Sequence, residues 1–228
     1  AWPTDGLALC TAADDQLNPA LVADGERGAI VAWFDYRSSP TISHLFAQHL
    51  LASGAVDPVW PIDGLALCTA PGGQAGHAII ADGTGGAFIA WHDFRGGLSA
   101  IYAQHVLASG AADPAWPTEG RALCIAANGR FYPKLVADGV GGAIVTWYDF
   151  RSSTISPDIY AQHVLASGAV DPAWPADGLA LCSAANSQEY PTIVADGVGG
   201  AITAWQDARN GTYDTYSHTW SDYDIYAQ

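Results

Sequence analysis

One pattern occurs four times along the 228-residue chain and constrains its fold more than any other feature. A W-x-D-x-R motif begins at residues 33, 91, 147 and 205, and an A-L-C triplet ends at residues 10, 68, 124 and 182. Both series advance in steps of 58, 56 and 58 residues. Repeats of about this length are typical of propellers and arrays, in which each unit packs against its neighbours. The chain therefore divides into four repeats of about 57 residues, at 1–58, 59–114, 115–172 and 173–228. We predict that the four repeats form a single domain.

Each repeat contains four short segments that favour β-strands. In the third repeat we expect strands at 133–138, 143–149 and 158–164, because these segments are rich in Val, Ile, Trp and Tyr. The A-L-C triplet, as at 122–124, supplies the fourth strand. The glycine-rich D-G-V-G-G between the first two strands predicts a tight hairpin. No window has a helical period.

The second strand of a repeat is apolar on both faces, since Ala143, Val145 and Trp147 alternate with the equally apolar Ile144. Small four-stranded sheets that stack around an axis bury both faces. We therefore predict an all-β fold, a four-bladed β-propeller. Because the chain opens on an A-L-C strand and stops in a third strand, we predict that the N-terminal strand pairs with the C-terminal blade and closes the ring. The alternatives are a half-ring that dimerises into eight blades, or a piece of a longer array.

Charge and hydropathy exclude several classes of protein. With 23 acidic and 8 basic residues the net charge is −15, which disfavours nucleic acid and anionic lipid as partners. No apolar run is long enough to span a membrane, so we predict no membrane insertion. An acidic surface suits an extracellular protein. The absence of methionine, even at position 1, indicates a processed chain or a fragment.

The four cysteines occupy equivalent positions, one in each A-L-C triplet: Cys10, Cys68, Cys124 and Cys182. Equivalent positions in successive repeats lie farther apart than the Cα separation that a disulfide allows. We therefore expect four unpaired thiols that pack as small apolar side chains.

The units D-G-V-G-G-A-I-V-T-W-Y-D-F-R and D-I-Y-A-Q at 138–162 resemble a repeat of secreted and surface proteins of bacteria, with the signature D-G-x-G-G-A, W-x-D-x-R, D-I-Y-A-Q. The resemblance covers the whole chain. It implies a propeller-like fold at an extracellular or cell-surface location, and no assigned reaction. Repeats 1 and 2 depart from the signature with S-H-L-F-A-Q and S-A-I-Y-A-Q, which lack the aspartate.

Two connections differ between the repeats. The distance from the arginine of W-x-D-x-R to the glutamine of A-Q is 11, 9, 11 and 19 residues, and the stretch after each cysteine keeps its length but changes its sequence. In an up-and-down blade these two connections lie at the same end. Binding residues concentrate on variable loops of a rigid scaffold, so we predict a binding face formed by 37–48, 95–104, 151–162 and 209–228.

The longest of these loops, 210–224, carries our candidate ligand or interface residues. Aromatic faces next to carboxylates hold sugars by stacking and hydrogen bonding; packing as an aromatic plug and a subunit contact are the alternatives. The candidates are Tyr213, Asp214, Tyr216, His218, Trp220, Asp222 and Tyr223. The N-G-T sequon makes Asn210 a candidate for N-glycosylation.

Two further sets of residues recur once per repeat. The W-x-D-x-R pairs share a strand face and are expected to form structural ion pairs, namely Asp35–Arg37, Asp93–Arg95, Asp149–Arg151 and Asp207–Arg209. His49, His105 and His163 follow A-Q on the third strand, too far apart to share a metal ion. We predict no catalytic residues and no cofactor; a Ca²⁺ ion in the Asp-rich loop is the alternative.

From these observations we predict a protein that is not an enzyme. Our first hypothesis is a non-catalytic extracellular binding or adhesion module whose partner is a glycan or a protein. The second is a structural protein that self-assembles into a filament or surface array, with copies of itself as partners. A propeller-type glycoside hydrolase ranks lowest, because no asymmetric catalytic cluster stands out from the fourfold repeat.

Overall fold

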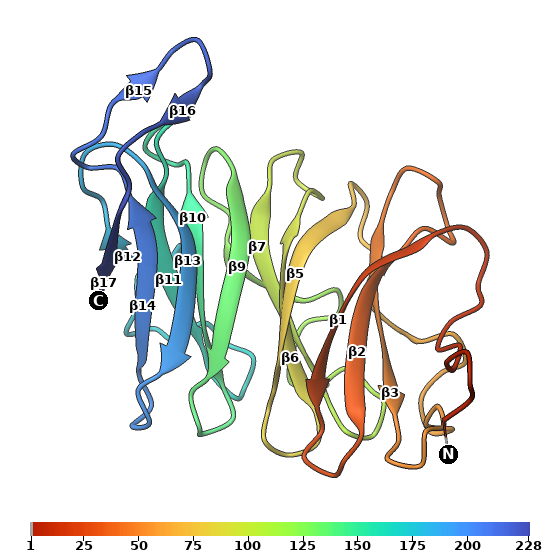
Figure 1. The fold of residues 1–228 in the computed structure, drawn as a ribbon. Helices are drawn as coiled ribbons and strands as arrows, with labels where there is room; N and C mark the ends of the chain where they lie inside the picture. The colour runs from red at the N-terminus through yellow and green to blue at the C-terminus, as the bar shows by residue number, and fades with distance from the viewer. Residues whose placement is uncertain (1) are drawn as a thin grey trace.

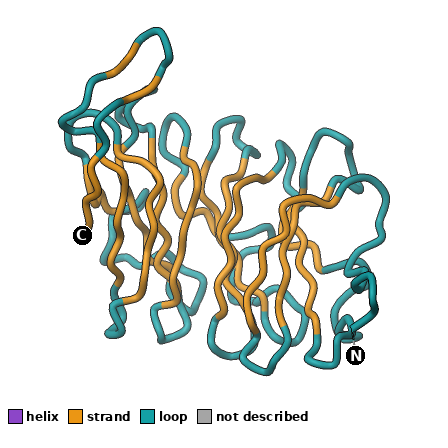
Figure 2. The backbone as a smooth tube through the Cα atoms, in the orientation of Figure 1, coloured by secondary structure: helices purple, strands orange, loops and turns teal. Residues whose placement is uncertain are grey.

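The computed structural model describes residues 2–228, and these form antiparallel sheets without helices (Figures 1 and 2). Sheet 1 contains β1 (Gln16–Ala23), β2 (Ala29–Asp35), β3 (His44–Leu50) and β4 (Leu65–Cys68). Sheet 2 contains β5 (Gln74–Ala81), β6 (Ala87–Asp93), β7 (Ala100–Val106) and β8 (Arg121–Cys124). Sheet 3 contains β9 (Arg130–Ala137), β10 (Ala143–Asp149), β11 (Asp158–Val164) and β12 (Leu179–Cys182). The predicted all-β class is confirmed.

Sheet 4 differs from the other three. It contains β13 (Gln188–Ala195), β14 (Ala201–Asp207) and β17 (Asp224–Ala227). A two-stranded hairpin of β15 (Tyr213–Asp214) and β16 (Thr219–Trp220) is inserted between β14 and β17 and projects beyond the sheets (Figure 1). The extra length of the fourth variable loop therefore forms a small element of its own.

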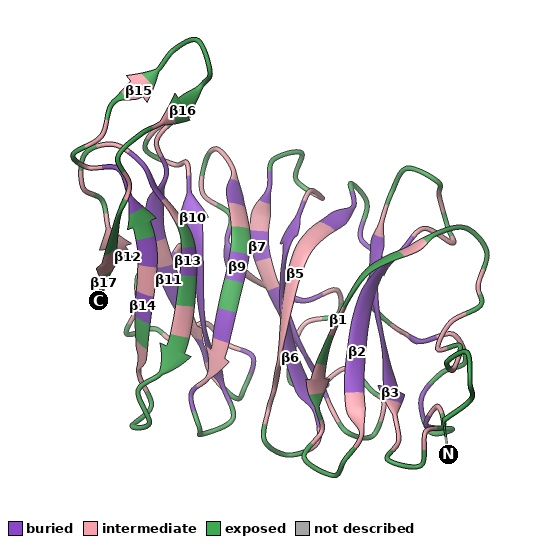
Figure 3. Ribbon diagram, in the orientation of Figure 1, coloured by how far each residue is buried: buried purple, intermediate pink, exposed green. Residues whose placement is uncertain are grey.

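The sheets follow one another in chain order, and each first strand contacts the first strand of the next sheet: β1 with β5, β5 with β9, and β9 with β13. Every second strand pairs with its first and third strands, so each sheet is an up-and-down meander. The second strands β2, β6 and β10 are buried almost throughout, because each has an apolar neighbour on both faces (Figure 3). Packing of sheet on sheet explains the two-sided apolar pattern of the sequence.

A bulge shifts the start of each first strand. We expected the first strand of the third repeat at 133–138, but β9 begins at Arg130 and its pairing with β10 slips between Thr146 and Tyr148. The residue that absorbs the slip is Tyr132, at φ 53°. The equivalent residues also have positive φ: Asn18, Gly76 and Tyr190. An extra residue in one strand breaks the alternation of side chains between the two faces. For this reason the sequence pattern did not show that residues 130–132 belong to β9.

The predicted closure of the ring does not form in this structure. The two termini lie at opposite ends of the row of sheets (Figure 1), residues 6–10 are not in a strand, and β17 pairs only with β14. The physical reason is the separation of the two end sheets, which lie at opposite ends of the row (Figure 1). The N-terminal segment stays on sheet 1, where Leu9 and Cys10 pack on Val31, Trp33 and Phe46, and does not reach sheet 4 of the same chain.

No helix in the described part of the chain is long and apolar enough to cross a membrane.

Candidate functional site

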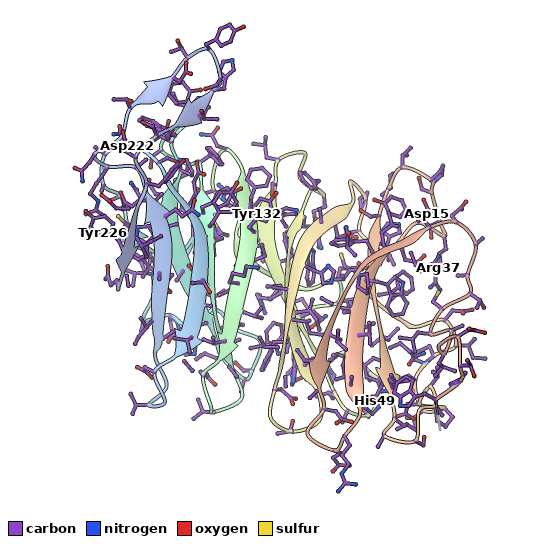
Figure 4. All side chains as sticks on the ribbon, viewed as in Figure 1. Asp15, Arg37, His49, Tyr132, Asp222 and Tyr226 are labelled. Carbon is purple, nitrogen blue, oxygen red and sulfur yellow. The ribbon has the colours of Figure 1, made fainter. Side chains whose placement is uncertain are left out.

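The two ends of the sheets carry different connections. At one end, the stretch after each cysteine accepts a hydrogen bond from the fourth residue of W-x-D-x-R, next to the variable connection, for example from Phe150 N to Gly129 O at 2.9 Å and from Ala208 N to Ser187 O at 2.8 Å. We call this the variable end. The hairpin turns between first and second strands lie at the other end. Arg37 and His49, labelled in Figure 4, mark the two ends of sheet 1.

Each predicted ion pair lies at the variable end as part of a larger network. The aspartate is fully buried and accepts hydrogen bonds from the arginine guanidinium, from the arginine backbone N–H and from the tryptophan indole two residues before it. In sheet 1 the Arg37 guanidinium lies 4.0 Å from the centre of the Phe46 ring. The arginine–aspartate contacts are 2.6, 2.8, 2.6 and 2.5 Å in sheets 1 to 4. A network repeated in every sheet is structural.

The cysteines belong to the same networks and form no disulfide. In sheet 2 the Arg95 Nη2 lies 3.1 Å from Cys68 Sγ, and that thiol lies 3.5 Å from Asp93. Burial raises the pKa of the Cys68 thiol, so it stays protonated. The thiols therefore join neighbouring sheets as weak hydrogen-bonding groups, as Cys68 of β4 does with sheet 2, in addition to the packing that we predicted.

The three histidines after A-Q lie at the opposite end, and each bridges two aspartates of its own repeat. His49 contacts Asp57 through Nδ1 at 2.8 Å and Asp24 through Nε2 at 2.9 Å. His105 and His163 make the same pair of contacts. Both imidazole nitrogens are occupied, and the aspartate that follows each histidine lies eight residues after it in all three repeats. Across residues 2–228 no group of three or more His, Cys, Asp or Glu side chains is arranged to hold a metal ion.

A cavity of about 650 Å³ lies at the variable end between the inserted loop and sheets 3 and 4. We call it the aromatic cavity. It is open to solvent and lined mainly by aromatic rings, together with one carboxylate. Its lining residues are Phe150, Thr154, Ile155, Glu189, Tyr190, Gln206, Tyr213, His218, Thr219, Trp220 and Tyr223. Asp222 and Tyr132, labelled in Figure 4, mark the inserted loop and the inner strand β9 in this region.

Contacts within the inserted loop hold its rings over the cavity. The Tyr213 and Trp220 rings lie 5.1 Å apart, and the Tyr213 hydroxyl lies 3.2 Å from His218 Nδ1. The Trp220 indole N–H donates to the carbonyl of Ile155 at 3.2 Å, which joins the loop to the connection of sheet 3. The loop is therefore an ordered wall of the cavity.

Four of the seven candidate residues of this loop line the cavity: Tyr213, His218, Trp220 and Tyr223. The other three do not. Asp214 caps the hairpin turn by accepting from Tyr216 N and from Ser217, and Tyr216 at the tip is 95% exposed. Asp222 accepts from the Ser221 hydroxyl, and Asn210 is exposed beside Asp224. Glycosylation of Asn210 stays a prediction.

Sequence reasoning missed Glu189, the carboxylate of the cavity. Its oxygen accepts a hydrogen bond from Ser187, which keeps the side chain in place. Burial raises the pKa of the neighbouring Tyr223 to about 12, and the charge of Glu189 adds to the rise. The signal was present, because Glu189 lies in the stretch after the fourth cysteine, where the other repeats carry Leu17, Ala75 and Phe131.

Further aromatic rings extend from the cavity along the inner strands. Tyr190 lies 5.9 Å from Tyr148 and 6.1 Å from Tyr132, measured between ring centres. Beyond them His92 packs 6.1 Å from Tyr132, and burial lowers the pKa of His92 to about 4, so it is neutral. The residue between Trp and Asp of the W-x-D-x-R motif thus differs in every sheet. These differences make the variable end asymmetric, although the rest of the motif is the same in all four sheets.

No family model and no curated protein matches the chain. Among solved structures it resembles an α-L-arabinanase of Penicillium chrysogenum that was solved with arabinobiose, with a TM-score of 0.62 and 11% identity over 93% of this chain. It also resembles an endo-arabinase of Bacteroides thetaiotaomicron, with a TM-score of 0.50, 14% identity and 93% coverage. The chain spans 62% and 74% of these two structures. At such identity the likeness shows a shared, propeller-like fold.

These neighbours require two corrections. We ranked a non-catalytic binding or adhesion module first and a hydrolase lowest, but the two solved structures described above, which share this fold, are arabinanases. The prediction that the chain is not an enzyme falls for the same reason. The error arose because we expected catalytic residues to form a sequence motif of their own. In this chain the four repeats differ at single positions that lie between residues common to all four.

Proposed function

We propose that this chain is a propeller-type glycoside hydrolase that binds a polysaccharide in the aromatic cavity. The observation that carries the proposal is the cavity itself, in which aromatic rings surround one carboxylate, Glu189. Sugar rings stack on aromatic faces through their C–H groups, and their hydroxyls need a few polar partners. The arabinanase-like fold supports the same class of ligand.

Arabinan is our first candidate substrate. The fold neighbours are named for it, and it is an uncharged polymer. The net charge of −15 disfavours acidic polysaccharides, since a polyanion would be repelled on approach. A polymer of this size is met outside the cell, in agreement with the extracellular location that we predicted. In this proposal the four sheets are four blades of the fold.

Glu189 is the proposed general acid, which protonates the glycosidic oxygen as its bond to the anomeric carbon breaks. A water molecule adds to that carbon. Its proton passes to solvent, because the cavity is open and Glu189 is the one carboxylate that lines it; Asp222 lies outside the lining and is given no role. Ser187 orients Glu189 by its hydrogen bond.

Reducing-sugar release from debranched arabinan by the purified 228-residue chain tests the proposal, with xylan, galactan and polygalacturonate for comparison. We expect release from arabinan and none from polygalacturonate. Glu189→Gln should lower the rate by about 10²–10⁴-fold, as expected for loss of a general acid. Glu26→Gln is the matched control, since Glu26 is exposed in the turn after β1.

Two results would contradict the proposal. One is no release from any of the neutral polysaccharides, and the other is a Glu189→Gln variant as active as the wild type. Asp222→Asn is a second control, because Asp222 lies outside the cavity lining and its loss should leave the rate unchanged.

A further inference from the structure

Sheet 4 lacks a strand that the other sheets have. The third strands β3, β7 and β11 each pair on their outer edge with an A-L-C strand, namely β4, β8 and β12. In residues 2–228 nothing pairs with the outer edge of β17. An open strand edge is a ready template for another strand.

The outer face of sheet 4 is also uncovered, although its residues are apolar. Ile202 in β14 is 50% exposed and Ile225 in β17 is 73% exposed. The equivalent residues of sheets 1 to 3 are covered by the following sheet and are at most 4% exposed: Ile30, Phe88 and Ile144, and Leu45, Ile101 and Ile159. Figure 3 shows the contrast, with β14 exposed at alternate positions and β10 buried.

Two polar groups of sheet 4 lack the partners that their equivalents have. Three arginines donate from Nη2 to a backbone carbonyl in the turn before the fourth strand, at 2.6, 2.7 and 2.6 Å, in the pairs Arg37–Asp63, Arg95–Glu119 and Arg151–Asp177. Within residues 2–228 the Arg209 side chain has hydrogen bonds only to Asp207 and Cys182. Three glutamines donate to a proline carbonyl of the same turn, in the pairs Gln48–Pro61, Gln104–Pro117 and Gln162–Pro175. Gln228 is the equivalent glutamine.

The same turn places a glycine against the tryptophan of each complete sheet. A Cβ atom at Gly178 would lie 2.8 Å from Cη2 of Trp147, and Gly64 and Gly120 stand in the same relation to Trp33 and Trp91. Trp205 of sheet 4 has no such glycine. A segment that completes sheet 4 must therefore offer a proline carbonyl, a second carbonyl, a glycine and an A-L-C strand, in that order.

One segment of the chain has this sequence and no strand partner. Residues 2–10 read W-P-T-D-G-L-A-L-C, which matches 60–68, 116–124 and 174–182, yet they are not in a strand. Its glycine, Gly6, has φ +89° and no atom within 4 Å of a Cβ placed on it. Cys10 already contacts Asp35 of sheet 1, just as Cys68 contacts Asp93 of the next sheet. The segment thus contacts the sheet that follows it, as the other A-L-C segments do, but its backbone is not paired with any strand.

We propose that residues 3–10 of a second copy of this chain add to β17 as the fourth strand of sheet 4. The register of sheet 3 places Cys10 opposite Ile225, Ala8 opposite Tyr226 and Leu7 opposite Ala227. The Asp5 carbonyl of the incoming copy accepts from Arg209, its Pro3 carbonyl accepts from Gln228, and Gly6 covers Trp205. Sheet 1 of that copy follows its N-terminal segment and covers Ile202 and Ile225.

This contact is strand addition between two different surfaces, the N-terminal segment of one copy and sheet 4 of the other. It differs from a two-fold contact, in which both copies use the same surface. The distinction can be tested with variants that disable one surface at a time, and it does not depend on the proposed hydrolase activity.

Light scattering coupled to size exclusion measures the assembly at about 100 µM, where weak contacts are occupied. We expect a mass of two copies or more. Ile225→Asp disables the acceptor and should weaken assembly by about tenfold or more, whereas Val198→Asp, at an exposed turn of the same sheet, should leave it unchanged. Gly6→Leu disables the incoming segment, and its matched control is Gly197→Leu, at φ +83° with no atom nearby.

Mixing the two disabled variants gives the deciding result. The Ile225→Asp copy retains an intact N-terminal segment and the Gly6→Leu copy retains an intact acceptor, so an equal mixture should form pairs although each variant alone is monomeric. A wild-type chain that is monomeric at this concentration, or a mixture that stays monomeric, would overturn the proposal. Circular dichroism of each variant verifies that it is folded.

Discussion

At the scale of single residues, the buried aspartate of each W-x-D-x-R motif is the centre of a hydrogen-bond network. Asp93 is fully buried, and its carboxylate accepts from the Trp91 indole and from Arg95. Although burial by itself raises its pKa, the hydrogen bonds from Arg95 and Trp91 hold the pKa below the usual value. The ionised form is therefore the one that the folded protein stabilises.

Asp93→Asn should lower the free energy of unfolding by about 3–5 kcal/mol, because the Arg95 charge loses its buried partner. Urea unfolding at pH 7 measures the change. Asp14→Asn, an exposed aspartate of the loop before β1, should be close to neutral. An Asp93→Asn variant as stable as this control would show that the network contributes nothing. The stability due to Asp93 should be present above about pH 4, the pKa of an unfolded aspartate, and be lost as the pH falls through its lower folded value.

His49 gives stability the opposite dependence on pH. Burial lowers the pKa of its imidazole, but the two bonds to Asp24 and Asp57 outweigh burial and raise it. The contribution of His49 is thus fully present below about pH 6.5, the unfolded value, and is lost as the pH rises through the higher folded pKa.

We expect the wild type to lose stability between pH 6 and 9 more steeply than His49→Gln, which cannot titrate. The measurement is the difference in free energy of unfolding between the two proteins as a function of pH. Parallel curves across this range would contradict the assignment. His163, which makes the same contacts in sheet 3, stays intact in both proteins and cancels in the difference.

At the scale of elements, the turn before each A-L-C strand positions that strand against its sheet. Gly178 has φ +97°, and a Cβ there would lie 2.8 Å from the Trp147 ring. Gly178→Ala should therefore destabilise the protein by about 1–3 kcal/mol more than Gly197→Ala, which has a similar φ but open space around it. Thermal unfolding of both variants provides the comparison, and equal melting temperatures would show that the tryptophan contact is unimportant.

The sequence predicted these elements well where their period was unbroken. The second and third strands of the third repeat match the prediction at 143–149 and 158–164. The first strand was predicted to begin three residues too late, because a bulge at Tyr132 changes which residues face the core. The inserted loop was recognised by its length and its aromatic residues. Its pairing as the hairpin of β15 and β16 was not predicted, because the loop has no clear strand pattern.

At the scale of the whole molecule, the sequence predicted the number of repeats and could not predict how they close. The constant spacing fixes which residues pair within one sheet. The angle between successive sheets depends on how side chains such as Phe34, His92 and Tyr148 fill the space between them, and these differ from repeat to repeat. Glu189 escaped prediction for the same reason, since its partners Trp220 and Tyr223 reach it only through the arrangement of two sheets and a loop.

The central claim is that the aromatic cavity holds a glycan, and calorimetric titration with an arabino-oligosaccharide tests it most directly. Trp220→Ala removes a ring that lines the cavity, while Tyr216→Ala removes a ring of the same loop that lies outside it. Loss of one stacking platform should weaken binding by about tenfold, as aromatic contacts of 0.5–1.5 kcal/mol plus lost area imply. We predict this weakening for Trp220→Ala and unchanged binding for Tyr216→Ala. Equal affinity of the wild type and Trp220→Ala, or no binding by the wild type, would contradict the account.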